Sequence, residues 1–149
     1  MIRINRQTDY AVRVVLALAK QGEGARLSTP TIQREMLIPP ALMPRIVAEL
    51  AKSGLIKTFP GRDGGMTLAR PADKITLRDV VEAFEGPILL SQCLEARGEE
   101  DCPFRVNCPV SPKWGRVQVA MLREMAAISF EDLAREAQGV PLVLGSAVS

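Results

Sequence analysis

The chain has 149 residues, of which 47% are hydrophobic and 24% charged, and its formal net charge is +2. This length is enough to bury a core but leaves room for only a small second lobe, and the composition excludes wholesale disorder. The first residues contain neither a signal peptide nor an apolar run long enough to span a bilayer, so we expect a cytoplasmic protein without a membrane segment.

The charges are divided unevenly between the two halves of the chain. Residues 1–75 contain 12 Lys or Arg and 6 Asp or Glu, whereas residues 76–149 contain 7 and 11. A basic half beside an acidic half is expected where one lobe binds a polyanion, because neutralised phosphates supply most of the non-specific affinity for nucleic acid. The first half is therefore the candidate DNA-binding lobe.

A first helix is predicted from Thr8 to Lys20, where apolar residues recur at steps of three and four. Thr8 or Asp9 can cap its start, because both side chains can accept a hydrogen bond from a free backbone N–H group.

Two further helices are predicted, one on each side of Pro39 and Pro40. A short helix covers about 30–37, and a second runs from about 41 to 53, with Gly54 in the position that ends helices. Pro44 must lie in the first turn of the later helix, because a proline farther inside costs roughly 3 kcal/mol. Two helices joined by a tight turn make a helix-turn-helix.

The spacing changes after the helix-turn-helix. Two short runs, 55–59 and 66–69, flank a glycine-rich turn and predict a β-hairpin, the wing of a winged helix. Apolar residues again recur at the steps of three and four that are typical of helices in three later segments, which begin at Thr76, Trp114 and Ser129; the second of them extends to Ala127. We therefore expect a mainly α fold with a small β-hairpin. The predicted divisions are a DNA-binding domain over 1–75, a second region over 76–137 and a flexible tail over 138–149.

Four basic residues lie on the predicted DNA-facing elements. Arg45, in the first turn or so of the third helix, is the candidate for contact with a base. Lys52, Lys57 and Arg62, at the end of that helix and in the wing, are candidates for contact with phosphates. Each could instead be an ordinary solvated charge, but their placement together favours a DNA-binding surface.

Three cysteines, Cys93, Cys102 and Cys108, form a C-x8-C-x5-C pattern in a segment rich in glycine, proline and acids. Thiolates on a short loop can hold a thiophilic metal, and the chain has no histidine, so any fourth ligand must be an oxygen donor. The alternatives are a zinc site, a thiol switch, or incidental cysteines. An enzyme is not expected, because no nucleotide-binding or hydrolase motif is present and a cysteine nucleophile would lack a histidine base.

The chain as a whole resembles the winged-helix regulators that include IscR and NsrR, the Rrf2 family. The similarity extends from residue 1 to about 137, and the matching segments are 8–13, 50–56, 61–68, 75–80, 84–86, the three cysteines and Trp114. This resemblance implies a DNA-binding transcription regulator, by expectation a repressor. It also implies a homodimer built on the helix around 112–127, a palindromic operator, and an iron-sulfur cluster on the cysteine loop.

Departures from the family pattern refine these expectations. IscR-like members have a histidine where this chain has Ser111, so the NsrR-like members, which sense nitric oxide, are the closer match. In those members an aspartate from the first helix of the partner subunit is the fourth ligand, and Asp9 occupies that place here. The resemblance favours a 4Fe-4S cluster with 2Fe-2S as the alternative, and the C-x8-C spacing, wider than the usual x5, leaves the cluster type open. Nitric oxide, iron supply and redox state all remain candidate signals.

Overall fold

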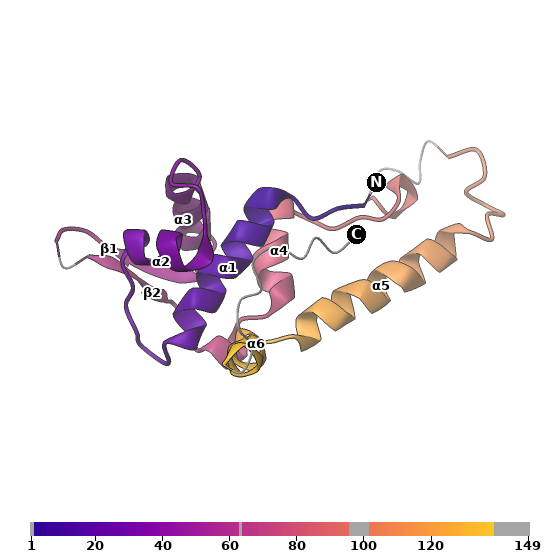
Figure 1. Cartoon of the computed structure of the whole chain (residues 1–149). Coiled ribbons are helices and arrows are strands. Elements are labelled where there is room, and N and C mark those ends of the chain that lie inside the picture. The colour runs from indigo at the N-terminus through magenta and orange to yellow at the C-terminus, as the bar shows by residue number, and fades with distance from the viewer. Residues whose placement is uncertain (1, 63, 96–101, 139–149) are drawn as a thin grey trace.

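The computed structural model describes residues 2–62, 64–95 and 102–138, and within these ranges it confirms a mainly α fold with one β-hairpin (Figure 1). In chain order the elements are α1 (Arg6–Lys20), α2 (Thr29–Met36), α3 (Met43–Lys52), β1 (Ile56–Phe59), β2 (Gly65–Leu68), the 3-10 turn η1 (Ala72–Lys74), α4 (Leu77–Glu85), the 3-10 turn η2 (Gln92–Leu94), α5 (Ser111–Ala127) and α6 (Phe130–Ala137). No helix among the described residues is both long and apolar enough to cross a membrane.

The first helix forms the centre of the DNA-binding lobe. α1 packs against α2, α3, α4, α6 and β2, and its buried face carries Ala11, Val14, Val15, Ala17, Leu18 and Ala19. The prediction that Thr8 or Asp9 caps this helix is wrong. The helix begins two residues before Thr8, and the side chain of Asn5 accepts the hydrogen bond from the Gln7 N–H group at 3.0 Å. Thr8 therefore lies inside the first turn, where it is buried.

The helix-turn-helix is formed by α2, the proline turn and α3. α3 begins at Met43, slightly later than predicted, because the residues before it form a turn in which Leu42 N–H donates to Pro39 O at 3.0 Å. Pro44 is the second residue of the helix, within its first turn as expected. Met43, Ile46 and Leu50 are fully buried against the core, which leaves the opposite face of α3 exposed.

The wing is an antiparallel hairpin in which Ile56 pairs with Leu68 and Phe59 with Gly65. The segment before α2 stabilises this hairpin, because Leu27 and Met66 form two backbone hydrogen bonds of 3.0 and 2.8 Å. Gly65 is required at this point: its φ is +131°, and a Cβ there would lie 2.5 Å from Leu27 O.

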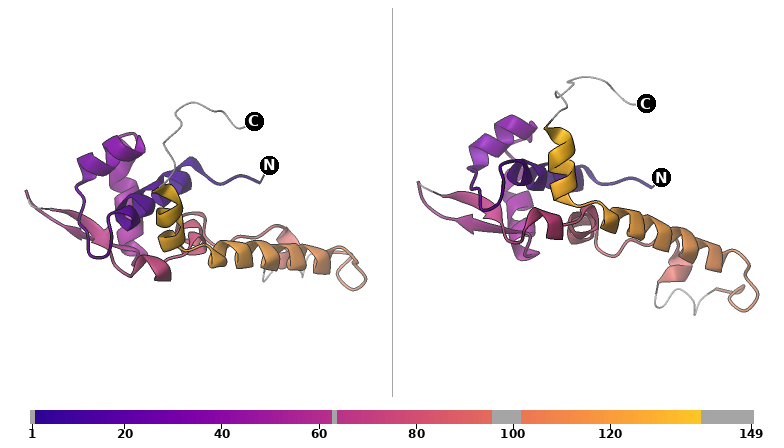
Figure 2. Two further views of the ribbon diagram at one scale, coloured as in Figure 1. Left: turned by 60° about the horizontal axis from the view of Figure 1, so that its bottom comes forward. Right: turned by 90° about the horizontal axis from the view of Figure 1, so that it is seen from below.

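Two arms extend from the lobe: helix α5, and the segment that runs from the end of α4 to η2 beside α5 (Figures 1 and 2). α5 begins at the far end, runs back to the lobe as a rod, and is followed by α6 beside α1. At the base of the arms, Leu77 N–H donates to Ile128 O and Phe130 N–H to Ile75 O, each at 2.9 Å. α5 begins at Ser111, three residues before the predicted Trp114, with Pro112 in its first turn. Of the predicted flexible tail, residues 139–149 lie outside the described residues.

The base of the arms generates a stability prediction. Phe130 is fully buried, so Phe130→Ala should lower the free energy of unfolding by roughly 3–5 kcal/mol. Phe104, which is 73% exposed, is the matched control, and Phe104→Ala should change stability by less than about 0.5 kcal/mol. Urea unfolding followed by circular dichroism measures both. Equal losses in the two variants would contradict this account of the core.

Candidate DNA-binding surface and cysteine segment

The four predicted DNA-contacting residues are exposed on α3 and the wing. Arg45 is the third residue of α3, Lys52 is its last, Lys57 lies in β1, and Arg62 lies in the turn of the hairpin. Within the described residues no ion pair engages any of these four side chains. Unpaired basic side chains on these elements are available to bind phosphates or base edges.

Arg26 is a basic residue of the lobe that the sequence reasoning did not single out. Its guanidinium lies over the ring of Phe59, 3.7 Å from the ring centroid. This cation–π contact joins the loop before α2 to the end of β1 and so helps to fix the wing relative to the helices. Nothing in the spacing of Arg26 and Phe59 along the chain indicates the contact.

Asp9 is half-exposed in the first turn of α1 and forms an ion pair with Arg13, one helical turn later, at 2.8 Å. Arg13 in turn lies 5.4 Å from the centroid of the Tyr10 ring and donates a long hydrogen bond of 3.5 Å to Met36 O. Met36 is the last residue of α2, so this chain of contacts runs from Asp9 to the helix-turn-helix. The spacing of Asp9 and Arg13 is a signal that sequence reasoning could have used.

Glu85, the last residue of α4, joins that helix to the start of α1. Its Oε1 accepts hydrogen bonds from the Asn5 N–H group at 2.8 Å and from Thr8 Oγ1 at 2.6 Å. Thr8 is the buried polar residue of this lobe, so Glu85 supplies the partner that its hydroxyl needs. Sequence reasoning did not find this contact.

A hollow of about 1000 Å³ lies beside Asp9. Residues of the N-terminal arm, α1 and α4 line it, and Met125 closes it from α5. Charged groups of both signs, Arg3 and Arg6 with Asp9 and Glu85, share its wall with apolar side chains. The hollow is large enough to receive a segment of another molecule.

None of the three cysteines is in a disulfide, and each is half-buried. Cys93 lies in η2, where its Sγ is 3.1 Å from Ser91 Oγ; the segment was predicted to be entirely loop. Cys102 accepts a hydrogen bond from the Arg105 N–H group at 3.2 Å through its carbonyl, and Cys108 lies three residues before α5.

The described part of the single chain contains no group of three or more His, Cys, Asp or Glu residues placed to hold a metal. Residues 96–101, between Cys93 and Cys102, lie outside that part. The donor chemistry nevertheless fits a thiophilic metal, because three cysteines outside any disulfide occur on one segment and the chain has no histidine to compete.

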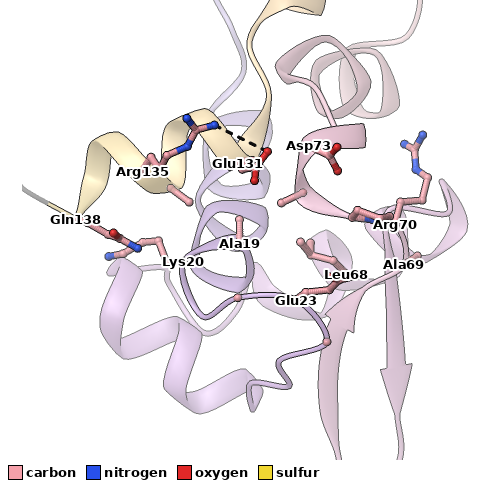
Figure 3. Close-up of a pocket in the computed structure, with 15 residues that line it drawn as sticks. Ala19, Lys20, Glu23, Leu68, Ala69, Arg70, Asp73, Glu131, Arg135 and Gln138 are labelled. Carbon is pink, nitrogen blue, oxygen red and sulfur yellow. Dashed lines mark ion pairs between the residues drawn. The ribbon is translucent and has the colours of Figure 1, made fainter.

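A second hollow, of about 460 Å³, lies between α1, β2, η1 and α6 (Figure 3). Its wall contains both acids and bases, and Arg135 on its rim pairs with Asp132 at 2.8 Å and with Glu131 at 3.8 Å. None of the candidate metal-binding or DNA-binding residues lines this hollow, so it belongs to neither candidate site.

A known protein family matches this chain, which combines a winged helix with a cysteine segment. The family model Rrf2, described as an iron-dependent transcriptional regulator, matches residues 4–136. The chain belongs to the Rrf2 family.

Individual relatives cover nearly the whole chain. Protein aau3 of Rhizobium meliloti (strain 1021) is 34% identical over 145 residues, which are 97% of this chain and 92% of that protein. The regulator NsrR of Geobacillus kaustophilus (strain HTA426) is 31% identical over 132 residues and 89% of each chain. The structure of CymR (YrzC), the global cysteine regulator of B. subtilis, is similar with a TM-score of 0.72, 26% identity, and coverage of 91% of this chain and 98% of that one.

Membership of the Rrf2 family makes the chain a transcriptional regulator and not an enzyme, as predicted. The winged-helix arrangement of the structural relative also confirms the predicted fold. These relatives do not assign roles to individual residues of this chain. The DNA-contacting residues and the metal ligands therefore stay predictions.

The contact between α4 and α1 generates a prediction for this Rrf2 protein. Glu85→Ala removes the acceptor of the buried Thr8 hydroxyl and should lower the free energy of unfolding by about 1–3 kcal/mol. The control is Glu82→Ala, also on α4, which removes only a surface ion pair with Arg78 and should cost less than about 1 kcal/mol. Denaturant unfolding measures both, and a smaller loss for Glu85→Ala than for Glu82→Ala would contradict the assigned role.

Proposed function

We propose that this Rrf2 regulator is a homodimeric repressor whose affinity for a palindromic operator is controlled by an iron-sulfur cluster on Cys93, Cys102 and Cys108. The observation that carries the proposal is the position of three half-buried cysteines, none of them in a disulfide, on the segment that joins α4 to α5, on the same chain as an exposed basic surface. The cytoplasmic location stays a prediction. The division of the chain into a DNA-binding domain over 1–75 and a second region over 76–137 is likewise part of the proposal.

The DNA contact would be made by α3 in the major groove, with Arg45 reaching a base edge from the first turn of the helix. Lys52, Lys57 and Arg62 would neutralise phosphates beside it. The buried face of α3 supports this arrangement, because Ile46 and Leu50 hold the helix to the core and leave the Arg45 side exposed.

The exposed surface of α5 supports a dimer. Within the described residues this 17-residue helix has no buried side chain, and Trp114, Val117 and Val119 are 43%, 52% and 63% exposed. Trp114 and Val117 are three residues apart and share one face of the helix, and neighbouring exposed apolar groups are typical of an interface between proteins. A second copy of the chain is the occupant that fits, because a palindromic operator requires two recognition helices related by two-fold symmetry.

The cluster ligands would be the three cysteine thiolates and, as the fourth, the Asp9 carboxylate of the partner subunit. When bound, a cluster with one carboxylate ligand supplies a more easily displaced position, open to nitric oxide or an oxidant. The hollow beside Asp9 supports contact with a second chain at this point. We favour 4Fe-4S, with 2Fe-2S as the alternative, and nitric oxide as the signal, with iron supply and redox state as the other candidates.

Asp9 could link this site to DNA binding through contacts within its own chain. Its carboxylate pairs with Arg13, and Arg13 reaches Met36 O at the end of α2. If the Asp9 carboxylate bound the cluster of the partner subunit, it would release Arg13, and the hydrogen bond from Arg13 to Met36 O at the end of α2 would change. The spacing of the two recognition helices, about 34–36 Å in a dimer on DNA, would then change without any base-contacting residue being touched.

A second candidate is a regulator of the same fold that uses the cysteines as a thiol switch or for zinc. The absence of a disulfide at the three cysteines and the similarity to the cysteine regulator CymR favour this alternative, in which no cluster is needed. Visible absorption distinguishes the two candidates, because an iron-sulfur cluster is coloured whereas zinc and thiols are not.

The DNA-binding part is tested with two arginine variants. Arg45→Ala should lose about 1–3 kcal/mol of discrimination between operator and mismatched DNA, because it removes a base contact. Arg62→Ala should weaken binding to all sequences alike and reduce its dependence on salt. Fluorescence anisotropy at several salt concentrations measures the affinities, and sedimentation should find two chains on each operator. Unchanged discrimination in Arg45→Ala would show that α3 is not the recognition helix.

The cofactor part is tested on protein purified without oxygen. The wild type should contain iron and sulfide and show visible absorption, and Cys→Ala at 93, 102 or 108 should abolish or destabilise the cofactor while the far-ultraviolet circular dichroism remains helical. Asp9→Ala and Asp9→Asn should both change the spectrum and uncouple DNA affinity from cofactor state. A triple cysteine variant with full iron and sulfide would end the proposal, and a colourless wild type would favour the thiol or zinc alternative.

A further inference from the structure

The cysteine segment leaves α4 and first passes alongside α5, and Cys93, the first of its three thiols, lies on this stretch. On this first stretch, the Leu90 N–H group donates a hydrogen bond of 3.0 Å to Gln118 Oε1 on α5. Leu94 lies beside α5 as well, because a Cβ placed on Gly115 would be 3.7 Å from its side chain. Gly115 and Gln118 are three residues apart and share one face of the helix.

Cys93 lies between these two contacts. Leu90 precedes it and Leu94 follows it, and Cys93 itself is in the 3-10 turn η2, which two hydrogen bonds of 3.0 Å close: from Leu94 N–H to Ser91 O, and from Glu95 N–H to Gln92 O. Ser91, whose hydroxyl contacts the Cys93 thiol at 3.1 Å, is next to Leu90. The position of this thiol relative to α5 therefore depends on a tie at either end of one turn.

We infer that Gln118 is a positioning residue: its amide oxygen holds the Leu90–Leu94 turn on α5 and so fixes Cys93 against that helix. Gln118 forms the side-chain hydrogen bond that crosses from one arm of the structure to the other at this level. Leu94 adds an apolar contact, which is less directional than a hydrogen bond and permits the turn to slide. The bond to Leu90 is therefore what sets the register of the turn along α5.

The position of α5 gives this tie a wider effect, and this step rests on the proposed function. The other end of α5 is anchored to the DNA-binding lobe, since Ile128 O accepts from Leu77 N–H and Phe130 is buried in the core. A change at Cys93 that displaces the Leu90–Leu94 turn would therefore also displace α5, and the other end of α5 is packed into the DNA-binding lobe. With Gln118 absent, the turn could move without moving α5.

The positioning is tested on the full chain carrying Cys102→Ser and Cys108→Ser, so that Cys93 is the one thiol left. Hydrogen–deuterium exchange of the Leu90 amide and the rate at which a disulfide reagent such as DTNB modifies Cys93 are measured for Gln118, Gln118→Ala and Gln118→Glu. Gln118→Glu keeps an oxygen acceptor. Gln92→Ala is the matched control, because Gln92 is exposed in the same turn and its side chain makes no hydrogen bond within the described residues.

Gln118→Ala should speed exchange at Leu90 and modification of Cys93 by about three- to tenfold, as expected for the loss of one hydrogen bond. Gln118→Glu should stay within about twofold of the parent, and Gln92→Ala should change neither rate. Exchange at the Leu77 and Phe130 amides, at the base of the arms, should be the same in every variant, which separates local positioning from a general loss of stability. Unchanged rates in Gln118→Ala, or equal increases in Gln92→Ala, would overturn the inference.

The transmission of a change at Cys93 through α5 to the DNA-binding lobe is tested with all three cysteines present. The ratio of operator affinities between cofactor-loaded and metal-free protein should fall toward one in Gln118→Ala, while the affinity of the metal-free form stays within about twofold of the wild type. A ratio equal to that of the wild type would overturn the transmission. The exchange experiment needs neither DNA nor cofactor, so a failure of the proposed function and a failure of the positioning give different results.

Discussion

Two backbone hydrogen bonds, Leu77 to Ile128 and Phe130 to Ile75, fasten the end of α5 to the start of α4. Both α4 and the following α6 pack on α1, so this junction ties the rod of α5 to the core of the molecule. Phe130, buried beside them, makes the return part of the core instead of a surface contact. The cysteine segment therefore begins at the end of α4, on the lobe, and ends at the far end of α5, whose other end returns to the lobe.

Most of the secondary structure could be predicted because it follows from local patterns. The spacing of apolar residues marks α1, α3 and α4, and the glycine-rich turn between two short apolar runs marks the wing. The ends of helices were less predictable. Asn5, rather than Thr8 or Asp9, caps α1, and α5 starts at Ser111, because hydrogen bonds and prolines outside the periodic stretch decide where a helix begins.

The candidate sites were predictable to the extent that their residues share one element. Arg45 and Lys52 follow from the assignment of α3, and the Asp9–Arg13 pair follows from helical spacing. The ties between elements could not be read in this way. Glu85 meets Thr8 across 77 positions, and Gln118 meets Leu90 across 28, and no local pattern relates such partners. They depend on how the helices pack, which a single sequence does not specify.

The two-armed design also frees the cysteine segment to vary in length. Because the start of α4 is bonded to the end of α5 and Leu90 is tied to Gln118, the stretch up to Cys93 stays on α5 whatever number of residues lies between Cys93 and Cys102. The entropy of closing a loop grows only with the logarithm of its length, so the wider spacing of this chain costs about half a kcal/mol or less. Insertions there can accumulate in evolution with little effect on the helix-turn-helix. The cysteine segment can thus change while the fold of the helix-turn-helix stays the same.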